Sequence, residues 1–328
     1  MNLFDTHYTR WEGKHTSIWI RRWNIALHGI RATLDGKLMK WLIGVSWSSA
    51  AMVCIVLFLI GQILIPENIL ESIGKQIDQV GVVVNGVLQW LNDNPDISIS
   101  SIYMLVFFVY SWGVTYLSLI AVTKAIPHLM TQDIGSKSLI IYTSKAINKY
   151  DYVLGKISAM AGVLMVIWFL PCFVAWVFSN AFAPEWHFFW YSRDALIFSL
   201  TYFAIAIVTV SIMAVAFSAV SSNPRTTTGM WLGYWAVCWI LEAIALGSPN
   251  FHWMRYASLR YNLSQIQQSV FNVEGYYQRL VEDVPGFSEI LGNKWVPETP
   301  MAGDAMFGLI FLCAISLFFI FRKVDSES

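Results

Sequence analysis

The chain is poor in charge and in cysteine. Only 13% of its 328 residues are Asp, Glu, Lys or Arg, which is about half of the share found in soluble domains. Its four cysteines all fall inside apolar runs, at spacings that match no zinc site: Cys54, Cys172, Cys238 and Cys313. Isolated thiols in such surroundings are usually small packing residues. The composition therefore excludes an ordinary soluble domain, and we expect neither a disulfide nor a bound metal.

Motifs that bind nucleotides or catalyse reactions are also missing. A phosphate loop requires a glycine, four residues and then Gly-Lys followed by Ser or Thr. The pair Gly155-Lys156 fails this pattern twice, because Tyr150 stands in place of the first glycine and Ile157 follows the lysine. The formal net charge of zero gives no general attraction to nucleic acid. We therefore expect a protein that is not an enzyme, binds no cofactor itself and has no nucleic acid partner.

Long apolar runs are what the chain does have. A helix needs about 20 apolar residues to cross roughly 30 Å of hydrocarbon. Six runs reach this length: 41–65, 102–123, 157–180, 195–221, 229–248 and 304–321. A seventh candidate, Val80 to Leu91, is too short and contains Asn85 and Gln89. The predicted fold class is therefore all-α, with one polytopic membrane domain over residues 1–328 and six transmembrane helices.

The distribution of Lys and Arg predicts that both termini are cytoplasmic. Segment 1–40 contains seven of these residues and segment 124–156 contains five. With both termini inside, fifteen of the 21 cations lie inside and six outside, as the positive-inside rule requires. Segments 66–101 and 249–303 then lie outside. We expect helical structure in both, with short helices in 249–303 that dip back toward the membrane or bind a partner.

The segment 16–40 has the pattern of an amphipathic helix. Its apolar residues recur at spacings of three and four: Trp19, Trp23, Leu27, Ile30, Leu34 and Leu38. Most of its basic residues fall off that stripe. Because the first span follows directly, we expect this helix to lie along the inner membrane interface. The alternative is a helix that packs against soluble protein.

The basic segment 124–156 lies between two spans and contains five lysines. Near its middle is an apolar run that is far too short to cross a bilayer: Leu139, Ile140, Ile141 and Tyr142. Exposed to water, this run would form an unsatisfied hydrophobic patch. We expect a protein partner to cover it, within a charged rim formed by Lys137, Lys145 and Lys149. Alternatively, the run packs against the protein's own inner helices.

Glu242 is the clearest ionisable residue inside an apolar run. A charged carboxylate at the bilayer centre costs about 2.5–3.5 kcal/mol on insertion scales, so it must be paired, protonated or facing water. One hypothesis makes Glu242 a contact for a substrate or a proton. The other makes it a protonated, hydrogen-bonded residue near the outer end of its span, which predicts that Glu242→Gln leaves folding intact. In the third span, Pro171 predicts a kink.

The stretch Asp133–Lys156 resembles the same region of the type-2 ABC exporter permeases. In that family, an acidic residue and small residues follow the second span. A basic turn, an aromatic residue and a Gly-Lys pair then precede the third span. The matching residues here are Asp133, Gly135, Ser144, Lys145, Tyr152, Gly155 and Lys156, while Ala146 replaces the usual proline. Residues 8–13 also look like the start of such permeases, and the six-span layout resembles theirs over the whole chain.

This resemblance implies a transmembrane permease subunit of an ATP-driven exporter. A pair of separate ABC ATPase subunits would bind ATP and Mg, and a second permease subunit, identical or homologous, would complete the transporter. We expect this chain to lie in a bacterial cytoplasmic (inner) membrane, in contact with its lipids. The segment between spans two and three would be a coupling helix that docks on the ATPase through Asp133, Lys137, Leu139, Ile140, Ile141, Tyr142, Lys145 and Lys149.

Two other classes of protein stay open. A proton-coupled secondary transporter could use Glu242 as its proton site, although such transporters often contain internal repeats and no convincing repeat occurs here. A non-transporting membrane scaffold would need no ionisable site at all. Copurification of an ABC ATPase would separate the exporter from both alternatives.

Overall fold

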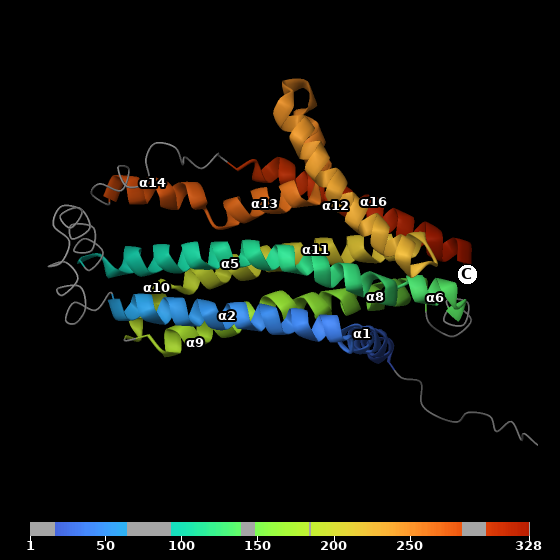
Figure 1. The fold of residues 1–328 in the computed structure, drawn as a ribbon, viewed down its shortest axis with the longest axis horizontal. Coiled ribbons are helices and arrows are strands. Elements are labelled where there is room, and N and C mark those ends of the chain that lie inside the picture. Colours follow the sequence, from blue (N-terminus) through green and yellow to red (C-terminus); the bar gives the residue numbers. More distant parts are fainter. Residues whose placement is uncertain (1–16, 64–92, 139–147, 184, 284–299, 328) are drawn as a thin grey trace, which may run out of the picture.

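The computed structural model describes residues 17–63, 93–138, 148–183, 185–283 and 300–327, and within these ranges the chain forms helices and no strand (Figure 1). Six of the described helices are long and apolar enough to span a membrane: Lys37–Gly61, Pro95–Gly135, Lys149–Ala181, Arg193–Val220, Pro224–Gly247 and Ala302–Ser326. By length and composition these are the helices of an integral membrane protein. The prediction of six spans and an all-helical fold is confirmed. The short candidate Val80 to Leu91 lies outside the described residues.

The spans are built from single helices or from consecutive helical pieces: α2 (Lys37–Ile63), α5 (Pro95–Ala125) with η1 (Ile126–His128) and α6 (Thr131–Gly135), α8 (Lys149–Leu164) with η2 (Met165–Phe169) and α9 (Leu170–Ala181), α11 (Arg193–Val220), α12 (Pro224–Gly247) and α16 (Ala302–Glu327). The helices outside the spans are α1 (Ile18–Leu34), α10 (His187–Tyr191), η3 (Pro249–Ala257), α13 (Leu259–Val270) and α14 (Val273–Asp283).

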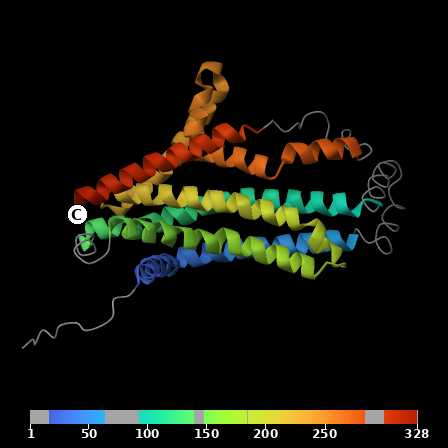
Figure 2. The ribbon, with the colours of Figure 1, turned by 180° about the vertical axis from the view of Figure 1, so that it is seen from behind.

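The central helix of the bundle is α11. In its most apolar window 67% of the residues are buried inside the protein, against 17–39% in the other five spans. Figure 1 shows α2, α5 and α11 running along the long axis, whereas α12 leaves the bundle at a steep angle. From behind, α16 lies along α11 (Figure 2). The end of α16 lies at the same end of the bundle as α1 and α6, so these three elements share one side.

All six spanning helices start before their apolar runs, and the difference is largest in the second and the third. The second begins at Pro95 rather than at residue 102, with Pro at the first helical position and Asp96 in the first turn, both of which favour a helix start. The third begins at Lys149 rather than at 157, with Asp151 in its first turn. Residues 149–156 are therefore helix, not loop. Hydropathy missed them because they are polar.

The predicted helix 16–40 is two helices. The first, α1, ends at Leu34 with Asp35 as its C-cap, and α2 begins at Lys37. Between them lies Gly36, a residue type that commonly ends helices. Figure 1 views α1 nearly end-on, so it runs across the axis of the bundle rather than along it. Residues 37–40, predicted as part of the amphipathic helix, belong to the first span.

The face of α1 that packs on α8 combines small residues with Ile25 and Ile30. A Cβ added to Gly29 would lie 2.7 Å from the Cβ of Ala159 in α8, and one added to Gly155 would lie 2.7 Å from the Ile25 side chain. Two helices can approach this closely only where one of them lacks a side chain. Of the predicted stripe, Trp19 and Trp23 point away from this contact and are 74% and 62% exposed. The two tryptophans therefore do not pack on α8, whereas Ile30 of the same predicted stripe does, against Gly162.

The third span is interrupted by a π-helical turn, Met165–Phe169, directly before Pro171. Proline has no N–H, so the carbonyl of Ile167, four residues earlier, loses its helical donor. The Ser46 hydroxyl of α2 donates to that carbonyl at 2.5 Å. An irregularity that would cost free energy in lipid is thereby satisfied by a neighbouring span. The sequence predicted a kink at Pro171, and the structure shows a π-helical turn directly before this residue.

We predict that Gly29→Ala loosens the contact between α1 and α8. Gly44, in α2, has nothing within 4 Å of an added Cβ, so Gly44→Ala is the matched control. Both substitutions gain the same helix propensity, about 0.5–1 kcal/mol. The added clash should make Gly29→Ala less stable than Gly44→Ala by about 1–3 kcal/mol. Thermal unfolding in detergent measures the difference, and equal stabilities would contradict the close approach of α1.

Candidate functional site

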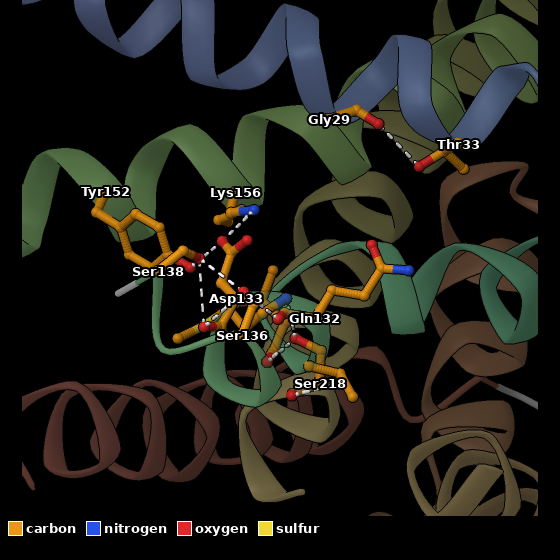
Figure 3. A network of polar contacts seen from close by, with 12 residues as sticks. Gly29, Thr33, Gln132, Asp133, Ser136, Ser138, Tyr152, Lys156 and Ser218 are labelled. Carbon is orange, nitrogen blue, oxygen red and sulfur yellow. Dashed lines mark hydrogen bonds and ion pairs between the residues drawn. The ribbon is translucent and has the colours of Figure 1, made fainter. Parts of the chain in front are cut away.

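An ion pair joins the two ends of the stretch Asp133–Lys156. The Lys156 ammonium of α8 lies 2.6 Å from a carboxylate oxygen of Asp133 in α6, and the Tyr152 hydroxyl donates to the same oxygen at 2.6 Å (Figure 3). The two charged side chains are 9% and 18% exposed. Three residues that the resemblance singled out therefore meet at one point. We call Asp133, Tyr152 and Lys156 the clamp.

Local structure explains why the clamp forms. Tyr152 and Lys156 are four residues apart on α8, so they lie on the same face of the helix. The Lys156 ammonium is 5.5 Å from the centre of the Tyr152 ring, within the range of a cation–π contact. Asp133 lies in the first turn of α6, where a helix favours negative charge. Each group thus has favourable local surroundings before the pair forms.

The short helix α6 is also bonded to the junction between α11 and α12. The Thr131 hydroxyl donates to the Ser218 carbonyl at 2.8 Å and lies 3.2 Å from the Thr227 hydroxyl. A Cβ on Gly135 would lie 3.2 Å from the Ser222 carbonyl oxygen, so glycine permits this close approach. The same small helix therefore contacts α8 on one side and the α11–α12 connection on the other.

The start of α8 is tied to two further helices. Arg22 of α1 donates to Asp151 at 2.7 Å, and the Lys149 ammonium lies 2.6 Å from Asp325 near the end of α16. Lys149 was predicted to belong to a charged rim that faces a partner, but here it pairs within the chain. Sequence reasoning missed Arg22, Asp151 and Thr131, since their partners are more than 80 residues away.

The remaining predicted residues of this segment divide into two groups. Lys137 follows α6 with φ 54°, a left-handed conformation that turns the chain out of the helix. Gly155 allows α1 to approach α8, as described above. The other members lie outside the described residues: Leu139, Ile140, Ile141, Tyr142, Ser144 and Lys145.

A second buried ion pair lies between α12 and α13. Glu242 of α12 accepts hydrogen bonds from the Ser258 hydroxyl at 2.6 Å and from the Arg260 guanidinium, whose Nε lies 3.1 Å away. The guanidinium also lies 4.0 Å from the centre of the Trp239 ring. Of the hypotheses for Glu242, this geometry fits a paired carboxylate.

The pairing arises because the chain turns back after α12. η3 runs beside α12, so that the Leu259 amide donates to the Tyr234 hydroxyl at 3.1 Å and Tyr234 reaches the Ala257 carbonyl at 3.2 Å. Residues far apart in sequence are thereby placed side by side. Within 249–303, the predicted short helices are η3, α13 and α14, and residues 284–299 lie outside the description. Arg260 could have been suspected as the partner of Glu242, because it follows the end of the fifth span closely in sequence.

Neither a family model nor a curated protein matches this chain.

We predict that the clamp contributes strongly to stability as a pair. Asp133→Asn or Lys156→Met alone leaves a buried charge without its partner and should cost about 3–5 kcal/mol. The double variant should recover much of that loss. The exposed pair Lys149–Asp325, with side chains 35% and 53% exposed, is the control and should contribute much less, because water screens an exposed ion pair. Thermal unfolding of the two double-mutant cycles measures both couplings, and equal couplings would contradict a buried clamp.

We also predict that Glu242→Gln destabilises the protein. The substitution leaves Arg260 without its counter-charge, at a cost of about 3–5 kcal/mol. Glu282, an exposed residue of α14, gives the control Glu282→Gln, which should change stability by less than about 0.5 kcal/mol. Denaturation in detergent compares the two. Wild-type stability of Glu242→Gln would restore the hypothesis of a protonated side chain.

Proposed function

We propose that the chain is the transmembrane permease subunit of an ATP-driven ABC exporter, and that residues 133–156 dock on a separate ATPase subunit. Two independent features support this function. The sequence of the segment resembles the coupling region of type-2 ABC exporter permeases. The described parts of the segment have a geometry that suits the transmission of force.

The clamp is the observation that carries the proposal. Asp133 and Lys156 hold the two ends of the segment within 2.6 Å of each other, so a force applied between them acts on a closed loop. Through Thr131 and Gly135, α6 passes that force to the α11–α12 junction. Through Asp151, the start of α8 passes it to α1. A force applied to this segment would therefore reach the second, third, fourth and fifth spans and also α1.

The proposed topology places this end of the bundle in the cytoplasm. The cations support it, since segments 1–40 and 124–156 hold twelve of the 21 Lys and Arg residues. In this orientation α1 lies along the inner interface of a bacterial cytoplasmic membrane, and its exposed Trp19 and Trp23 enter the headgroup region, where tryptophan is favoured. Segments 66–101 and 249–303 then lie outside.

In this proposal the chain supplies no catalytic group and no cofactor site. ATP and Mg bind to the ATPase pair, and nucleotide-driven closure of that pair moves the coupling segment. A second permease subunit, identical or homologous, provides the other half of the pathway. The spans then alternate their opening between the two sides of the membrane.

A proton-coupled secondary transporter is the weaker candidate. Its proton site would be Glu242, but the contacts with Arg260 and Ser258 engage both carboxylate oxygens. Glu242 is better explained as the residue that fixes the returning segment to α12. A scaffold without transport activity is separated from the exporter by the next experiment.

We predict that Ile140→Asp together with Tyr142→Asp abolishes binding of the ATPase. Charges introduced into a docked apolar run would be buried without partners, at a cost of several kcal/mol. The tagged chain should copurify with a subunit that contains a phosphate loop and hydrolyses ATP. The double variant should insert and fold normally but lose that subunit, and the chain alone should hydrolyse no ATP.

The matched control places two acids at exposed positions of the same end of the bundle. Asn24→Asp with His28→Asp, both exposed on α1, should keep the ATPase and its activity. If the double variant in the segment retained full ATPase binding and transport, the docking role would be wrong. If no ATPase copurified with the wild-type chain under any condition, the scaffold would become the better hypothesis.

We predict that a membrane-impermeant maleimide labels Gln278→Cys but not Ser136→Cys in intact cells. Both positions are exposed, and the proposed topology places them on opposite sides of the membrane. The four native cysteines are free and lie within spans, so they should give little background. Ser136→Cys should become reactive once the cells are opened. The reverse pattern would invert the topology.

A further inference from the structure

A groove lies between the ends of α11 and α16, on the same side of the molecule as α1 and α6. Its volume is about 250 Å³, and its apolar wall is formed by Ala216, Ala219, Val220 and Phe319. Ala216 and Ala219 are three residues apart on one face of α11. The groove is deep here because their side chains are small. The space corresponds to roughly eight water volumes of ~30 Å³, enough for part of an extended chain of methylene groups.

Two cations stand at the rim of the groove. Arg322 is exposed and Lys323 is half-buried, and both line it. Among its described lining residues, none carries a negative charge. The nearby Asp325 is engaged by Lys149 at 2.6 Å. The groove therefore combines an apolar wall with a positive rim.

The position of the groove matches the boundary between hydrocarbon and water. In α16 the apolar run ends with Phe321, and Arg322 and Lys323 follow directly. A ligand in the groove would thus have one end beside hydrocarbon and the other beside two cations. Basic pockets between transmembrane helices at this level bind the head groups of anionic lipids.

We propose that this groove binds an anionic phospholipid of the adjacent leaflet, with its phosphate at Arg322 and Lys323 and the upper part of one acyl chain along Ala216 and Ala219. A free anion fits less well, because α11 and α16 both end here and the carbonyl groups of helix C-termini disfavour negative charge. A lipid offsets that cost by burying apolar surface along the wall. This inference does not depend on the transport function.

The test measures lipid retention by the full-length chain in detergent. The wild type is exchanged into defined mixtures of phosphatidylglycerol and phosphatidylcholine, and bound lipid is counted by native mass spectrometry. Arg322→Gln should weaken phosphatidylglycerol binding about fivefold, the effect of one surface cation. Val220→Trp should weaken it at least as much, because the indole fills the groove while both cations remain. Arg31→Gln, at an exposed position of α1 on the same side, is the control and should change binding less than twofold.

Each outcome separates one alternative. Loss of binding in Arg322→Gln with full binding in Val220→Trp would mean general surface attraction and would overturn the proposal. Equal losses in Arg31→Gln and Arg322→Gln would do the same. Displacement of the lipid by inorganic phosphate would indicate a site for free anions. A change from dimer to monomer in Val220→Trp, without a change in bound lipid, would assign the groove to a second copy. Val220→Phe, with a smaller ring, replaces Val220→Trp if the latter unfolds.

Discussion

The ion pair between Asp133 and Lys156 is the interaction on which the end of the bundle near α1 and α6 depends. Removing both charges from water is costly, and attraction repays that cost only where geometry is good and further hydrogen bonds are made. Here the separation is 2.6 Å, and the Tyr152 hydroxyl occupies the same carboxylate oxygen. Because one partner lies at the end of the second span and the other within the third, the pair fixes how these two spans are joined at this end of the bundle. The residues through which α6 and α8 bond to other helices, Thr131, Lys149 and Asp151, lie close to this pair in sequence.

The pair Glu242–Arg260 has the corresponding role between α12 and α13. After α12 the chain turns back along it as η3, and buried polar groups in such a segment must find partners within the protein. Ser258 and Arg260 satisfy Glu242, while the Tyr234 hydroxyl satisfies the backbone at Ala257 and Leu259. The carboxylate that sequence alone made a candidate transport site is therefore bonded within the chain. Both ion pairs join residues of two different helices.

The sequence predicted the spans well, because the thickness of hydrocarbon imposes a minimum length on every apolar run. It predicted the ends poorly. Residues 149–156 continue α8 as polar helix, and hydropathy cannot distinguish polar helix from polar loop. The resemblance to type-2 ABC exporter permeases identified the three members of the clamp but not their contact. That contact depends on how the second and third spans pack. Likewise, Glu242 was recognised as costly, but its partner is brought close only by the return of η3, for which the sequence offered no more than a general expectation of short helices.

The packing of α1 is a second feature that the sequence alone could not predict. Periodicity selected Trp19 and Trp23 as the apolar stripe, since large apolar residues dominate such patterns. The contact with α8 instead uses Gly29 and Gly155, where the absence of a side chain lets the helices approach. Glycine contributes nothing to an apolar stripe, so this face could be recognised only with both helices in view.

The most direct test of the proposed coupling is a cryo-EM structure of the assembly that copurifies with the tagged chain. We expect an ATPase subunit bound at the end of the bundle that carries α1 and α6, with residues 139–147 in its groove and the Asp133–Lys156 pair intact at the base of that contact. An ATPase bound elsewhere on the chain, or an assembly in which this segment touches no partner, would contradict the proposal.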